Sequence, residues 1–144
     1  IGAHLNGATE KQLKALSDFA IPAGIAFQLI DDILGFFGDP KRGGEEDLAD
    51  IKEGKMTLLV VKAMELVGGP ESDFIREMVG NEGISVDEAN RLRRIIRSCG
   101  SEDYSRKLAG SYSKRALEAL DPDLLDRDVI EFLEGFTDYL MNRA

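Results

Sequence analysis

Apolar residues recur at helical spacing along almost the whole chain, and this pattern sets the class of fold. The clearest case is residues 10–37, where one broad apolar face is interrupted by Pro22, which should kink the helix. The face consists of Leu13, Leu16, Phe19, Ala20, Ala23, Phe27, Ile30 and Leu34. No stretch shows the strict apolar and polar alternation of a half-buried strand. The spacing therefore predicts an all-α protein.

Glycine, proline and capping residues divide the rest of the chain into further helices. A short first helix should end at Asn6-Gly7, and Thr9 with Gln12 has the spacing of a capping box. Ser85 with Glu88 has the same spacing. Later helices are expected over about 56–67, 72–79, 86–99 and 102–120, followed by a terminal helix with an apolar stripe.

One long segment, from Gly38 to Gly54, has the composition of a loop. It is rich in glycine and charge and contains one proline. Loops longer than about 12 to 15 residues in compact domains are usually functional or disordered. The sequence therefore makes this segment a candidate for ligand contact.

Composition and charge restrict the classes of function. The 144 residues include 27 acidic and 18 basic side chains, and a net charge of -9 opposes binding to nucleic acid. No unbroken apolar run reaches the ~18 to 20 residues of a membrane span. A single cysteine, Cys99, fits a reducing compartment, so we expect a cytoplasmic protein. Ile1 enters helix-like sequence at once, and we expect the chain to be truncated.

Two adjacent carboxylates, Asp31 and Asp32, interrupt the apolar helix near its end. Asp31 lies one turn after Phe27 and Gln28, so the three side chains share a helix face. Acidic groups near a helix C-terminus oppose the helix dipole, and a cation should compensate them. Mg²⁺ would suit, because it takes oxygen ligands and bridges carboxylates to phosphates. The alternative is an exposed pair of aspartates with no ligand.

A lysine, Lys55, stands where the predicted loop meets the next apolar helix. The free N–H groups of a helix N-terminus and an adjacent ammonium group suit a phosphate. The alternative is a solvated surface lysine.

These two segments follow one another in an order that resembles the trans-isoprenyl diphosphate synthases, the polyprenyl synthetase family. The order is Phe-Gln-x-x-Asp-Asp, then Gly-Asp, then Asp-x-x-Glu-Gly-Lys-x-Thr-Leu, at residues 27–32, 38–39 and 50–58. Ile95 to Leu108 also resembles the family's Gly-Ser/Ala-x-x-Tyr segment, and the residues from Tyr112 resemble its closing helices. The resemblance extends over essentially the whole chain.

The resemblance implies an isoprenoid-synthase helical bundle, of which residues 1–144 would be the C-terminal half of a single domain. In the family two aspartate-rich motifs face each other across a central cavity, and this chain has only the second. The implied reaction is Mg²⁺-dependent ionisation of an allylic prenyl diphosphate, followed by condensation with isopentenyl diphosphate. A half domain would be inactive until it pairs with the missing N-terminal half.

The resemblance also assigns roles to individual residues. Asp31 and Asp32 would hold Mg²⁺ and Lys55 would contact the allylic diphosphate, which makes these three the catalytic residues. Phe27 and Gln28 would face the prenyl groups, and Lys41 would also bind substrate.

Two positions depart from the family pattern. The usual third aspartate of Asp-Asp-x-x-Asp is Gly35. Glu45 stands where many members have a lysine that contacts diphosphate, and Lys41 or Arg42 would have to replace it.

These departures keep a second function open, that of a noncatalytic or regulatory partner of a prenyl diphosphate synthase. In either case we expect a homodimer or a pairing with the missing half, because a half domain would leave apolar helix faces uncovered.

Overall fold

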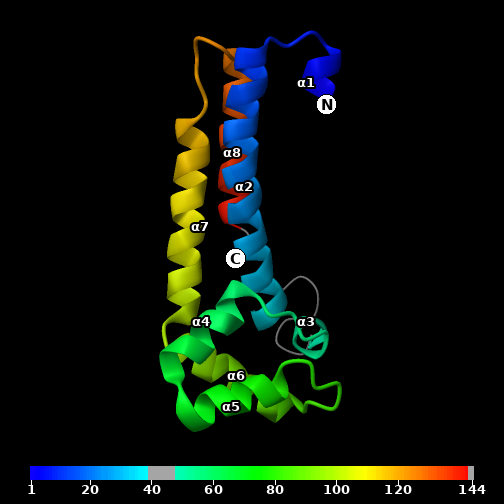
Figure 1. Ribbon diagram of the computed structural model, residues 1–144, viewed down its shortest axis with the longest axis vertical. Coiled ribbons are helices and arrows are strands. Elements are labelled where there is room, and N and C mark those ends of the chain that lie inside the picture. Colours follow the sequence, from blue (N-terminus) through cyan, green and yellow to red (C-terminus); the bar gives the residue numbers. More distant parts are fainter. Residues whose placement is uncertain (39–47, 143–144) are drawn as a thin grey trace. The chain divides into compact units, whose positions relative to one another are not determined.

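Helices make up all the regular structure of the described residues, which in the computed structural model are 1–38 and 48–142 (Figure 1). They are α1 (Gly2–Leu5), α2 (Glu10–Phe37), α3 (Ala49–Lys52), α4 (Leu58–Val67), α5 (Gly69–Met78), α6 (Val86–Ser98), α7 (Ser101–Glu118) and α8 (Arg127–Met141). The prediction of an all-α protein is therefore confirmed for this part of the chain.

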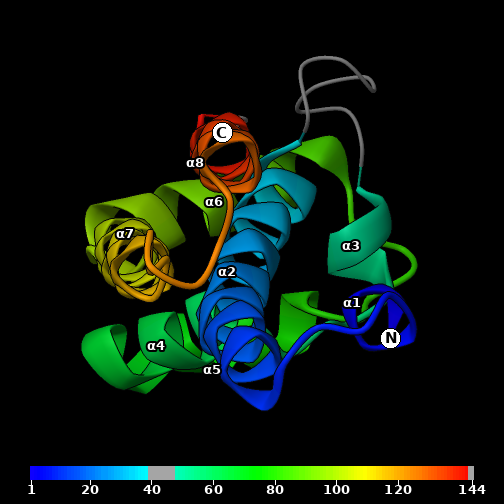
Figure 2. The same ribbon diagram turned by 90° about the horizontal axis from the view of Figure 1, so that it is seen from above.

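The first of two compact units combines Ile1–Gln28 with the described residues from Leu108 onward. Within it, the early turns of α2, the later turns of α7 and α8 run side by side, as Figure 2 shows in end view. Phe19 and Ala23 pack against Ala116 in its core. The side-chain amide of Gln12 donates to the Leu124 carbonyl at 2.9 Å, which ties the start of α2 to the segment before α8.

The second unit comprises Leu29–Lys107. In it α4, α5 and α6 pack on one another. Its largest fully buried apolar side chains are Ile33, Ile51, Leu59, Val60, Ile75, Leu92 and Ile96. The Ser101 hydroxyl donates to the Leu59 carbonyl and so fixes the first turn of α7 on α4. Because α2 and α7 contribute to both units, the single domain expected over residues 1–144 stays a prediction.

Helix α2 begins and ends where its apolar spacing predicts, and it continues through Pro22. The predicted capping box forms at its start. The Gln12 N–H donates to the Thr9 hydroxyl at 3.3 Å, and the Thr9 N–H donates to the Gln12 side chain at 2.9 Å. These two bonds satisfy backbone donors that have no partner inside the helix.

The same helix is the only one in the described residues with the length and composition of a membrane span. Its most apolar window of 18 residues has a mean hydropathy of 1.5, although the sequence has no unbroken apolar run of that length. A long core helix meets the same criterion, and α2 supplies Phe19 and Ile33 to the two cores.

The boundaries after α2 differ from the predicted ones in two places. The loop expected over 38–54 contains a helix, α3, which forms because the chain buries Leu48 and Ile51 there. Residues 39–47 lie outside the described part of the chain. Helix α5 begins at Gly69 rather than Ser72, because Pro70 occupies its first turn, where the missing N–H costs nothing.

The capping box of α6 gives a prediction about stability. The Ser85 hydroxyl accepts from the Glu88 N–H at 3.3 Å and donates to the Glu88 carboxylate at 2.7 Å. We expect Ser85→Ala to lower the free energy of unfolding by about 1 kcal/mol at neutral pH. Urea denaturation measures this change, and Ser111→Ala, an exposed serine within α7, is the matched control.

The pH dependence of this effect follows from the same contacts. Hydrogen bonds from the Ser85 hydroxyl and then from its N–H lower the pKa of Glu88. A lowered pKa in the folded state contributes stability above the ordinary pKa, and this contribution is lost as the pH falls through the lowered value. The difference between Ser85→Ala and the unmodified chain should therefore shrink in acid. A difference that grows in acid would contradict this reading of the cap.

Candidate functional site

Asp31 and Asp32 lie in the last two turns of α2, within the second unit. Asp31 is exposed and Asp32 is half-buried, and the adjoining Ile33 is buried. This places one carboxylate of the pair at the surface and turns the other partly toward the protein. The position agrees with the predicted interruption of an apolar helix by two acidic groups near its end.

The end of α2 has no basic residue of its own, and α6 provides the cations instead. The buried Arg93 donates from Nε to the Phe36 carbonyl at 3.1 Å. The Arg97 guanidinium lies over the Phe37 ring, 4.5 Å from its centroid. Positive groups at a helix C-terminus donate to its free carbonyls and interact favourably with the negative end of its dipole. The sequence predicts a cation that compensates the negative charge at the end of α2. Arg93 and Arg97 of α6 provide part of this positive charge.

Lys55 is held by two carboxylates that precede it in the chain. Its ammonium donates to Asp50 Oδ1 at 2.7 Å and lies 3.1 Å from Glu53 Oε2. These hydrogen bonds, that to Asp50 first, raise the pKa of Lys55. The ammonium group therefore stays charged at physiological pH, and its side chain is 48% exposed. Two of its three N–H donors face these carboxylates, so a phosphate oxygen would share the ammonium group with them.

A glycine turn orients Lys55. Gly54 has a φ of +71°, which disfavours any residue with a side chain. A Cβ there would lie 3.0 Å from the Gly80 Cα, and the Gly80 N–H donates to the Ile51 carbonyl at 2.8 Å. The end of α3 is thus fixed against the turn that follows α5. This close backbone approach accounts for the glycine of the Glu-Gly-Lys order.

The two predicted segments meet through Asp50. A Cβ built on Gly35 of α2 would fall only 1.7 Å from Asp50 Oδ2, so the carboxylate fills the space of a side chain at position 35. Its other oxygen binds Lys55. In the sequence Asp50 belongs to the Lys55 motif, and nothing in that motif predicts a role for it. The sequence feature that could have pointed to Asp50 is Gly35, which leaves a gap in an otherwise acidic motif.

The start of α4 follows Lys55 closely, as predicted. Thr57 is its N-cap residue, but its side chain makes no capping hydrogen bond. The buried Thr57 hydroxyl oxygen has no partner among the described residues. The start of α4 therefore has hydrogen-bond donors without acceptors: the Thr57 hydroxyl, the first backbone N–H groups and the nearby ammonium group. A bound anion would supply the acceptors.

Phe27 and Gln28 belong to the part of α2 in the first unit. Phe27 is half-buried and lines an apolar cavity of about 250 Å³, whereas Gln28 is exposed. The other residues that line this cavity are Phe19, Ala20, Ala23, Gly24, Phe136 and Leu140. Because the lining residues are apolar, this cavity suits an apolar ligand group.

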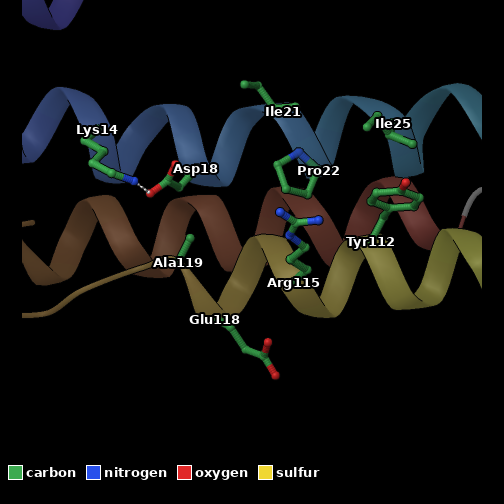
Figure 3. Close-up of a pocket in the computed structure, with 9 residues that line it drawn as sticks. All are labelled: Lys14, Asp18, Ile21, Pro22, Ile25, Tyr112, Arg115, Glu118 and Ala119. Carbon is green, nitrogen blue, oxygen red and sulfur yellow. Dashed lines mark hydrogen bonds and ion pairs between the residues drawn. The ribbon is translucent and has the colours of Figure 1, made fainter.

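A larger cavity of about 460 Å³ in the same unit contains none of the predicted site residues (Figure 3). The residues around it are Lys14, Asp18, Ile21, Pro22, Ile25, Tyr112, Arg115, Glu118 and Ala119. Lys14 and Asp18 form an ion pair at its edge, so two of its charges are already matched. The size of this cavity is therefore no reason to regard it as the active site.

Three positions named from the sequence, Lys41, Arg42 and Glu45, lie outside the described residues. Within the described residues, no group of three or more His, Cys, Asp or Glu side chains is arranged to hold a metal ion. A Mg²⁺ site in this part of the chain would therefore depend on one or two carboxylates and on ligand oxygens, which is usual for Mg²⁺ bound with a phosphate substrate.

Comparison with known proteins gives consistent results. Residues 1–96 match the polyprenyl synthetase family model. The geranylgeranyl diphosphate synthase of Sulfolobus acidocaldarius is 37% identical over 141 residues, which are 95% of this chain and 42% of that protein. The geranylfarnesyl diphosphate synthase of Aeropyrum pernix is 37% identical over 145 residues, covering 100% of this chain and 44% of its own length.

A solved structure gives the same picture of the fold. Geranylgeranyl pyrophosphate synthase from Corynebacterium glutamicum, complexed with isoprenyl diphosphate and magnesium, matches with a TM-score of 0.86 and 29% identity. The match covers 99% of this chain and 41% of that one. The predicted helical bundle is confirmed, and the chain spans about two fifths of the length of the relatives it matches.

Proposed function

Because this chain belongs to the polyprenyl synthetase family, we propose that it is the part of a trans-prenyltransferase that binds the diphosphate of an allylic prenyl substrate. The observation that carries the proposal is the contact of Asp50 with both Gly35 and Lys55. It joins the acidic face of α2 to a charged lysine at a helix start. Carboxylates for a metal ion and a cation for phosphate oxygens thus occur together.

The donor set fits Mg²⁺. Asp31 and Asp32 offer carboxylate oxygens, and Asp31 is exposed to solvent. Mg²⁺ is usually held by one or two carboxylates, with substrate phosphates and water completing its shell. When bound there with the substrate, the ion would supply neutralisation of the charge that develops on the departing diphosphate.

The remaining chemistry falls to the side chains. Lys55 would donate to diphosphate oxygens, and this contact gains strength as the allylic C–O bond breaks and its electron pair leaves with the diphosphate. By resemblance to the family, Phe27 would face the prenyl chain and help to keep water from the allylic cation. The alkene of isopentenyl diphosphate then attacks the allylic cation and forms the new C–C bond, and the resulting carbocation would lose a proton to the released diphosphate, which restores a C=C bond.

The chain matches only part of its relatives, so activity is tested best in a complete domain. We propose a chimera in which this chain replaces its 141-residue match in the Sulfolobus acidocaldarius synthase. With Mg²⁺, an allylic diphosphate and labelled isopentenyl diphosphate, the chimera should form elongated prenyl diphosphate, and excess chelator should abolish the product. A correctly folded chimera with no product would overturn the proposed function.

A second function, that of a noncatalytic partner of a prenyl diphosphate synthase, is favoured by one observation. Lys55 is already paired with two carboxylates, which weakens it as a phosphate ligand. This function predicts that the chain co-migrates with a partner synthase on a sizing column and changes its rate or product length. If neither effect occurs, the second function is excluded.

Helix α8 carries exposed aromatic side chains, which favour association with another protein surface. Phe132, Phe136 and Tyr139 are 69%, 45% and 63% exposed, and the rings of the first two stack. Exposed aromatic patches of this kind mark interaction surfaces. We propose that a second copy or the rest of the family domain covers them.

A further inference from the structure

A small cavity on α6, within the second unit, is lined by side chains that donate hydrogen bonds. Its volume is about 160 Å³, and the described residues around it are Asn90, Arg93, Arg94 and Arg97. Pockets for drug-sized ligands are larger, at roughly 300 to 1,000 Å³. Guanidinium groups donate hydrogen bonds and accept none. The size and the lining of this cavity therefore suit a small anionic group.

One of the three arginines is buried in the protein. Arg93 is 2% exposed, its Nε donates to the Phe36 carbonyl at 3.1 Å, and its Nη1 donates to Asn90 Oδ1 at 3.2 Å. Hydrogen bonds of this kind are what allow a charged group to be buried. They also fix the direction of the guanidinium group. One wall of the cavity is therefore positively charged and held in place.

The carboxylates of the described residues neutralise only part of the charge of the other two arginines. Arg97 Nε lies 3.1 Å from Glu102 Oε2, but the other oxygen of Glu102 lies 2.8 Å from Arg106 Nη2. One carboxylate is thus shared by two guanidinium groups. Arg94 is exposed, and its guanidinium has no hydrogen-bond or ion-pair partner in the described part of the chain. An anion in the cavity would supply the acceptors.

We propose that this cavity binds a phosphoryl dianion, which is either inorganic phosphate or the phosphate group of a small phosphorylated molecule. Guanidinium groups bind phosphate oxygens through paired N–H donors, and such charge-assisted hydrogen bonds are stronger than neutral ones. Arg94 and Arg97 donate from the solvent side, and the buried Arg93 donates from the protein side. The site does not include Lys55 or Asp31, so its ligand is additional to the allylic substrate.

Binding at this cavity bears on the end of α2. Arg93 donates to the Phe36 carbonyl, and the Arg97 guanidinium lies 4.5 Å from the centroid of the Phe37 ring. An anion that contacts both guanidinium groups fixes them in these positions. A ligand that binds only the folded state also stabilises that state. Phosphate should therefore slow hydrogen exchange at the Phe36 and Phe37 amides and raise the urea concentration at which the chain unfolds.

The test is a titration of the full chain with inorganic phosphate, in which chloride keeps the ionic strength constant. The Nε–Hε NMR signals of Arg93, Arg94 and Arg97 should shift in a saturable manner. Arg94→Met should raise the midpoint phosphate concentration about 10-fold or more, because hydrogen bonds between charged groups are the strong ones. Arg91→Met removes the same charge from an exposed position of α6 outside the cavity, and it should change the midpoint less than about twofold.

The stability measurement separates binding from the general effect of salt. Phosphate stabilises folded proteins without a binding site, because it is excluded from their surface. This general effect should be the same in Arg94→Met and in the unmodified chain. Slower exchange at Phe36 and Phe37 in phosphate should occur in the unmodified chain and in Arg91→Met but not in Arg94→Met. A purely structural role of Arg94 would not produce this dependence on phosphate.

Two further anions identify the chemistry that the cavity recognises. Glycerol phosphate distinguishes the sources of the phosphoryl group, because tighter binding than inorganic phosphate indicates a phosphorylated small molecule and weaker binding indicates free phosphate. Either order supports the site. Acetate at the same ionic strength should bind more weakly, since it carries one charge and two oxygens.

The proposal would be overturned by arginine signals that do not saturate with phosphate, by an unchanged midpoint in Arg94→Met, or by acetate that binds as tightly as phosphate. The result does not depend on prenyl transfer. If phosphate binds as expected but the chimera forms no product, the site on α6 stands and the proposed function fails.

Discussion

Replacing Asp31 by asparagine in the chimera is expected to lower kcat for prenyl elongation by about 10²- to 10³-fold, the usual loss when one group that stabilises transition-state charge is removed. Asparagine has the same shape, so the helix should remain intact. It carries no negative charge to hold a cation beside the departing diphosphate. Because that charge develops fully only on ionisation, kcat should fall more than the KM for the allylic substrate rises.

The control for Asp31→Asn is Asp18→Asn, which removes the same charge from an exposed position of the same helix. It should leave kcat within about twofold, since exposed ion pairs contribute little to stability. Raising the Mg²⁺ concentration should recover part of the Asp31→Asn loss but change the control little. Equal rates for both variants would show that Asp31 has no part in ionisation.

Replacing Arg93 by methionine is expected to destabilise the folded chain by about 2 to 4 kcal/mol, because a hydrogen bond from a charged group contributes about 1.5–3 kcal/mol and a buried acceptor left unpaired costs more. Arg93 is 2% exposed and donates to the Phe36 carbonyl and to the Asn90 side chain. Methionine retains the apolar stem but donates no hydrogen bond. Urea denaturation followed by circular dichroism measures the change.

Arg94→Met is the matched control, because Arg94 is exposed on the same helix. Its free energy of unfolding should change by less than about 0.5 kcal/mol, as surface substitutions usually do. Hydrogen exchange at Phe36 and Phe37 should become faster in Arg93→Met and not in Arg94→Met, since α2 loses its contact with α6. Equal stabilities would show that the buried guanidinium does not hold the end of α2.

Much of the fold could be predicted from local pattern. The apolar spacing of α2 and the capping boxes at Thr9 and Ser85 are sequence-local, and the structure places them as expected. The short helix α3 could not be predicted, because four residues have too little pattern and the helix depends on burying Ile51. Helix starts are set by such tertiary contacts as well as by propensity.

The candidate site could be predicted only in its parts. Asp31 and Lys55 stand out because charged residues interrupt or adjoin apolar helices. Asp50 was missed because its importance depends on a contact with Gly35, fifteen positions earlier in the numbering, which no periodicity encodes. The space left by Gly35 and the carboxylate of Asp50 come together only in the folded chain.

The most direct test of the account is whether this chain binds a diphosphate through Mg²⁺ at these residues. Inorganic pyrophosphate, added to the isotopically labelled chain, should shift the amide signals of Lys55 and Thr57 and of the α2 turn containing Asp31, and only when Mg²⁺ is present. Identical shifts without Mg²⁺, or shifts confined to the arginines of α6, would contradict the account.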